Sequence, residues 1–210
     1  TAASLAAVGP AIIEWNRLRQ SDSLSFSAYA SFLAAHPGWP GEAAMRRTAE
    51  RVLTPEMMEP RQAVAFFDRF APLTNTGQAR YAEALAAIGR QDEARAAARK
   101  AWTSGSLSTA DEARMLTAFG GSFTPADQDE RMDRLLWAGA TSAAARQLPL
   151  VTIARRPLFE ARLAMRPRAA DAATKANAVL PAALGDAGYL ADRALWLRAT
   201  GQAGAARQLL

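Results

Sequence analysis

His36 is the only histidine of the chain, and Glu42 follows it closely enough for the two side chains to act as an acid and a base. Both belong to the stretch 32–53, in which Trp39 lies between two prolines. A single histidine directly before a proline is more typical of a turn at a helix end than of a catalyst. We therefore expect His36 to be structural. An enzyme acting through it is an alternative, for which His36→Ala would abolish the activity.

The other side chains form no recognisable catalytic arrangement. The absence of cysteine excludes disulfides, thiolate zinc sites and cysteine nucleophiles, and no Gly-x-Ser-x-Gly turn marks a serine nucleophile. Gly120 and Gly121 lack the lysine and the later glycines of a phosphate-binding loop. The carboxylates at 127, 129 and 130 fit the first turn of a helix better than a metal site. We predict no catalytic, cofactor-binding or metal-binding residue in this chain.

Tryptophan is the remaining candidate for ligand binding, because its ring face can stack on a sugar ring. The chain has five tryptophans, Trp15, Trp39, Trp102, Trp137 and Trp196. Trp137 and Trp196 recur within a repeated pattern at helical spacing, which favours packing in the core. Trp39 lies in the Pro-x-x-Pro corner instead, and we retain it as the one possible glycan contact.

The composition predicts an all-α protein. Alanine makes up about a quarter of the residues, and β-branched residues are scarce. No apolar run approaches the ~20 residues that a membrane span needs. The net charge of +5 comes almost wholly from arginine, which fits either a coding bias or an anionic partner. Because these arginines are dispersed and not interleaved with aromatic residues, we expect no nucleic-acid partner.

Helix start and stop signals predict about a dozen short helices with tight connections. Ser25, Ser108 and Thr124 are predicted helix caps, and Pro40 is predicted in the first turn of its helix. The helices are expected at residues 4–19, 25–35, 40–53, 60–71, 75–89, 90–102, 108–119, 124–138, 141–148, 157–166, 168–180, 188–200 and from 202 onward.

A degenerate internal repeat links several of these segments. Residues 133–148 and 192–210 share Asp-Arg-x-Leu-Trp, then a glycine, then Ala-Ala-Arg-Gln-Leu, and residues 79–102 keep the same order of residue types. We interpret each copy as a helical hairpin with glycine at the turn and alanines where the helices approach. The predicted fold is an α-superhelix, or solenoid, of short antiparallel hairpins resembling tetratricopeptide repeats with irregular spacing.

Several of these segments, in this order, resemble the N-terminal superhelical, U-shaped domain of soluble lytic murein transglycosylases. The first is Phe32-Leu33-x-x-x-Pro37-x-x-Pro40 with the following helix that carries Arg46 and Arg47. The later ones are the segments 77–120, 116–139, 145–149 and 192–210. Each motif alone is common in helical repeats, so the resemblance rests on the ordered set.

The resemblance implies a periplasmic enzyme of peptidoglycan turnover that cleaves the bond between N-acetylmuramic acid and N-acetylglucosamine and leaves a 1,6-anhydro end. In that family a lysozyme-like domain carries the catalytic glutamate in a Glu-Ser motif, and no glutamate of this chain precedes a serine. We therefore expect residues 1–210 to be one non-catalytic domain, a fragment lacking its catalytic domain, that holds or orients glycan strands. The alternative is a helical-repeat adaptor that binds a protein partner.

Overall fold

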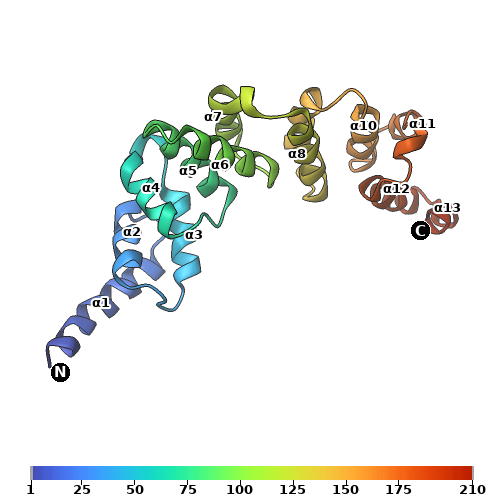
Figure 1. Ribbon diagram of the computed structural model, residues 1–210. Coiled ribbons are helices and arrows are strands. Elements are labelled where there is room, and N and C mark those ends of the chain that lie inside the picture. The colour runs from blue at the N-terminus through green and yellow to red at the C-terminus, as the bar shows by residue number, and fades with distance from the viewer. Residues whose placement is uncertain (1, 210) are drawn as a thin grey trace. The chain divides into compact units, whose positions relative to one another are not determined.

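The computed structural model describes residues 2–209, and their side chains from Val8 onward. Over these residues the chain contains only helices, turns and loops, and no strand (Figure 1). It divides into two compact units, residues 1–101 and 102–210. The predicted all-α fold of short helical hairpins is confirmed within each unit, whereas the single domain over 1–210 stays a prediction.

Within the first unit, neighbouring helices pack in pairs, with α2 against α3 and α4 against α5. Aromatic side chains fill much of its interior, among them the edge-to-face pair Phe26 and Phe66, whose ring centroids lie 5.2 Å apart. The elements are α1 (Ala2–Gln20), α2 (Phe26–Ala35), α3 (Glu42–Val52), η1 (Pro55–Met57), α4 (Pro60–Arg69), α5 (Asn75–Ala87) and α6 (Gln91–Thr103), whose last two residues belong to the second unit.

The second unit continues the pattern, with α8 against α9, α10 against α11 and α12 against α13. One buried cluster joins α8, α9 and α10, and a second joins α10, α11 and α12. The elements are α7 (Thr109–Phe119), η2 (Gly120–Ser122), α8 (Pro125–Trp137), α9 (Thr141–Gln147), η3 (Leu148–Leu150), α10 (Arg156–Met165), α11 (Ala172–Asn177), η4 (Pro181–Ala183), α12 (Ala187–Ala199) and α13 (Ala203–Gln208).

The predicted caps are confirmed, and the predicted bounds of two helices are wrong. Ser25, Ser108 and Thr124 each accept a backbone N–H in the first turn of their helix. Pro40 lies before its helix, because Gly41 adopts a left-handed conformation with φ 82° and the helix begins only at Glu42. The helix predicted over 168–180 is shortened to α11, because a left-handed residue precedes it and Pro181 follows it.

The glycine predicted at each hairpin turn has a defined structural role. Gly89, Gly139 and Gly201 end their helices in the left-handed conformation, with φ of 86°, 71° and 82°. At each turn the next residue donates its N–H to the carbonyl oxygen five residues earlier, at 2.8–2.9 Å. This is the Schellman arrangement, which satisfies carbonyl groups left unpaired at a helix end. The repeat seen in the sequence is therefore a repeated way of ending a helix.

The same turn occurs between α10 and α11 with Arg168 in the place of glycine. Arg168 is the only described non-glycine residue with a positive φ, at 56°, and Ala169 donates its N–H to the carbonyl of Ala164 at 2.9 Å. The Arg168 side chain is exposed and makes no ion pair among the described residues. Its side chain therefore contributes little to offset the left-handed backbone.

We expect Arg168→Gly to raise the free energy of unfolding by about 0.5–1 kcal/mol, because glycine adopts this conformation without a steric penalty. Urea denaturation followed by circular dichroism measures the change. Gly139→Ala is the matched control. It should lower the stability by a similar amount because alanine disfavours the left-handed backbone, and no steric clash adds to this effect, since no atom lies closer than 3.8 Å to the added Cβ. A less stable Arg168→Gly variant would contradict this account of the turn.

Two further glycines, Gly77 and Gly188, lie in the first turn of a helix, where the lack of a side chain leaves room for a buried charged group. A Cβ on Gly77 would lie 2.3 Å from a carboxylate oxygen of Glu50, and a Cβ on Gly188 would lie 2.3 Å from the guanidinium carbon of Arg162. Glu50 accepts hydrogen bonds from the N–H groups of Leu73 and Thr74 at 2.7 and 2.8 Å. In each unit a charged side chain thus fixes one helix against the start of a later one.

Candidate functional site

The corner predicted from the sequence is built by the end of α2 and the turn that leads to α3. His36 ends α2 and donates its N–H to the carbonyl of Phe32 at 2.9 Å. The carboxylate of Glu42 accepts the N–H of Gly38 at 2.6 Å, which closes the turn over the start of α3. Trp39 lies between these two anchored ends and is half-buried.

Trp39 belongs to a cluster of four rings. It meets Phe32 edge-to-face with ring centroids 5.6 Å apart, and the rings of His36 and Trp15 lie at 5.1 and 6.1 Å. Trp15 donates its indole N–H to the carbonyl of Pro40 at 2.8 Å, which ties α1 to the corner. The neighbouring rings fix the orientation of the Trp39 ring, while part of its surface stays exposed to solvent.

The acid and base suggested by His36 and Glu42 are not paired in the structure. The His36 ring packs against Phe32 and Trp39, whereas the carboxylate of Glu42 binds Gly38 and lies 3.7 Å from a guanidinium nitrogen of Arg46. Each side chain thus has a structural task in the corner. The interpretation of His36 as a turn residue is supported by this packing.

The corner has the features of a small stacking surface. A fixed, partly exposed indole ring provides an apolar face, and charged groups surround it: Arg19 lies over Trp15 at 4.4 Å, and Glu42 and Arg46 flank the start of α3. Hydroxyl groups of a ring-shaped ligand could bond to these charges while its apolar face lies on the indole.

Trp137 was expected in the core, and this prediction is wrong: 53% of its surface is exposed. It lies on the wall of a groove of about 370 Å³ between α8 and the start of α12. The guanidinium carbon of Arg162 lies over the ring, 5.6 Å from its centroid. Trp196, in contrast, packs against the cluster of α10, α11 and α12 as expected.

The acidic side chains of this groove are largely engaged by the protein itself. Asp133 pairs with Arg162, Asp186 pairs with Arg155 at 3.2 Å, and Asp129 accepts hydrogen bonds from Thr152. The groove around Trp137 is therefore mainly a structural junction.

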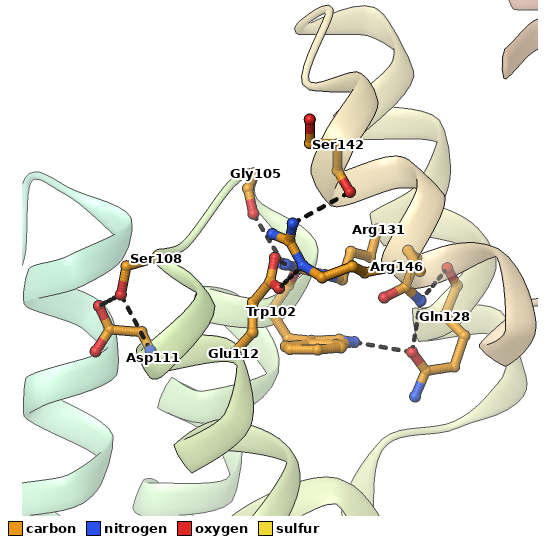
Figure 2. Close-up of polar contacts among 10 residues, drawn as sticks. Trp102, Gly105, Ser108, Asp111, Glu112, Gln128, Arg131, Ser142 and Arg146 are labelled. Carbon is orange, nitrogen blue, oxygen red and sulfur yellow. Dashed lines mark hydrogen bonds and ion pairs between the residues drawn. The ribbon is translucent and has the colours of Figure 1, made fainter.

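A buried ion network lies at the start of the second unit (Figure 2). Arg131 donates to the carbonyls of Trp102 and Gly105 at 2.8 and 2.9 Å and to the carboxylate of Glu112 at 2.8 Å. Arg146 binds the other oxygen of that carboxylate at 2.8 Å, nearer to solvent. Burial lowers the pKa of Arg131, while the hydrogen bond to Glu112 raises the pKa of Arg146.

The guanidinium of Arg131 also stacks on the Trp102 ring, 3.9 Å from its centroid, and the opposing ring of Phe123 is nearly parallel at 5.0 Å. The charged groups of this network satisfy one another, which is typical of a structural core. This network was not predicted from the sequence, because arginines at 131 and 162 look like surface residues of an amphipathic helix.

Over residues 2–209 no group of three or more acidic or histidine side chains is arranged to hold a metal ion. None of the described helices is both long and apolar enough to cross a membrane. Comparison with known proteins adds no relative. No family model, curated protein or solved structure matches the chain.

Proposed function

We propose that this chain is the non-catalytic helical scaffold of a periplasmic lytic transglycosylase and that it holds glycan strands of peptidoglycan near a separate catalytic domain. The observation that carries the proposal is the half-buried Trp39 ring, held by Phe32 and Trp15 at the corner where the sequence resembles that family. An indole fixed in this way loses little side-chain freedom on binding, which favours stacking on a sugar ring.

The charge of the chain is compatible with this ligand. Peptidoglycan carries carboxylates on its stem peptides, and a protein with a net charge of +5 attracts such a polymer over a distance set by the ionic strength. The proposed mechanism is positioning: the scaffold raises the local concentration of glycan beside the catalytic domain. In this proposal, cleavage belongs to the separate catalytic domain.

Co-sedimentation with purified murein sacculi tests the proposed contact. We expect Trp39→Ala to weaken binding by about tenfold, equivalent to about 1.4 kcal/mol, because the stacking face is lost. Trp39→Phe keeps an aromatic ring and should retain part of the affinity. Circular dichroism establishes that both variants fold.

The matched control is Trp137→Ala, which removes another exposed indole outside the corner and should leave sedimentation unchanged. Release of anhydro-muropeptides by the chain alone would overturn the assignment as a scaffold. Absence of any binding to sacculi would sink the proposed contact and favour the adaptor alternative.

A further inference from the structure

The hairpin of α12 and α13 carries an open, mainly apolar groove of about 610 Å³. Leu195 lies at its edge and is 63% exposed, beside small side chains of both helices. The alanines that line the groove are Ala191, Ala194, Ala203 and Ala206. Such small residues let another helix approach closely, so the surface has the shape of a helix-packing site.

The repeat shows what covers this surface elsewhere in the same unit. Leu195 occupies the Leu position of the Asp-Arg-x-Leu-Trp pattern, and Leu136 occupies it in α8. Leu136 is wholly buried, in a cluster that includes Phe159 of α10. The leucine at this repeat position is thus buried against α10 in one hairpin and exposed in the other.

Charge defines the chemistry of the occupant. Arg198 and Arg207 line the groove, and neither makes an ion pair with another described residue. Arg146, which has the place of Arg207 in the other Ala-Ala-Arg-Gln-Leu copy, binds the carboxylate of Glu112 on a neighbouring helix at 2.8 Å. Glu112 belongs to α7, so an arginine at this repeat position can pair with a carboxylate on an adjacent helix.

We propose that the groove between α12 and α13 binds an amphipathic helix of a partner protein. Its apolar side chains would lie on Leu195 and the alanines, and its carboxylates would pair with Arg198 and Arg207. This is recognition of a helix in a groove, in which apolar anchors provide affinity and the flanking charges select the partner. The inference does not depend on glycan binding, since it concerns a different unit of the chain.

Fluorescence anisotropy with a designed peptide tests the proposal on the full chain. The probe is a labelled amphipathic helix of about 18 residues, long enough to be partly helical, with leucine and alanine on one face and glutamate on its flanks. A matched peptide carries lysine in place of every glutamate. We expect the glutamate peptide to bind at least tenfold more tightly than the lysine peptide.

Two matched variants distinguish binding in the groove from nonspecific hydrophobic binding. Leu195→Gln should weaken binding of the glutamate peptide at least tenfold, whereas Ile153→Gln should leave it unchanged, although Ile153 is 85% exposed in the same unit. Both positions are on the surface, so both variants should fold, which circular dichroism checks. The double variant Arg198→Glu with Arg207→Glu should reverse the preference in favour of the lysine peptide.

Three outcomes would overturn the proposal. Equal binding of the two peptides would show that charge does not select the partner. If Ile153→Gln weakened binding as much as Leu195→Gln, the peptide would not bind specifically in the groove. Sedimentation equilibrium provides the third: a dimer that Leu195→Gln dissociates would identify a second copy of the chain as the occupant. Binding of murein sacculi by the Leu195→Gln variant should equal that of the unchanged chain, so this experiment fails or succeeds independently of the glycan contact.

Discussion

Arg131→Met is expected to lower the free energy of unfolding of the second unit by about 3 kcal/mol. The substitution removes three donated hydrogen bonds from a fully buried site, including the one to Glu112. The carbonyls of Trp102 and Gly105 would then be left without this donor, and each unsatisfied buried group costs about 1–3 kcal/mol. Urea denaturation monitored by tryptophan fluorescence measures the loss.

Arg146→Met supplies the matched control because it removes the other partner of the same carboxylate. The Arg146 side chain is 42% exposed, and exposed ion pairs contribute only about 0–1 kcal/mol. The difference between the two variants therefore reports burial and not the number of ion pairs. Equal losses would show that the buried position of Arg131 has no special energetic weight.

Gly77→Ala is the second substitution with a large expected effect, a loss of about 3 kcal/mol in the first unit. The added Cβ would overlap the carboxylate of Glu50, which is wholly buried and cannot move aside without breaking its bonds to Leu73 and Thr74. Overpacking costs about 1–3 kcal/mol, and lost hydrogen bonds to a charged group add about as much. Thermal unfolding by circular dichroism is the measurement.

The control for this prediction is Gly9→Ala, since nothing lies within 4 Å of the Cβ it adds within α1. It should be neutral or slightly stabilising, because alanine favours a helix more than glycine does. A double variant, Glu50→Ala with Gly77→Ala, should cost less than the sum of the two single changes, because the overlap then disappears. Simple additivity would mean that the clash is not the cause.

The local sequence signals predicted most of the helical pattern correctly. Thr124 with Asp127 forms the full capping box expected from the spacing, and the glycines at 89, 139 and 201 end their helices as the repeat indicated. These features depend on a few neighbouring residues, so they can be read along the chain. The helix predicted to begin at Pro40 begins later, because the left-handed conformation of Gly41 delays its start to Glu42.

Burial of charge and exposure of aromatic rings could not be predicted in the same way. Arg131 and Arg162 occupy core positions where apolar residues are usual, and only the folded structure shows the carbonyls and carboxylates that surround them. Trp137 lies on a groove wall, with the guanidinium of Arg162 over its ring. The corner around Trp39 was located from the sequence, whereas the contact with Trp15 joins residues distant along the chain.

The fit of Glu50 onto Gly77 and of Arg162 onto Gly188 has a consequence for the ancestry of such proteins. Each pair joins a residue without a side chain to a charged residue 26 or 27 positions earlier in the chain, and a Cβ on either glycine would overlap that charged group. Coupled substitution of the glycine and its charged partner would provide a pattern by which distantly related sequences could be aligned.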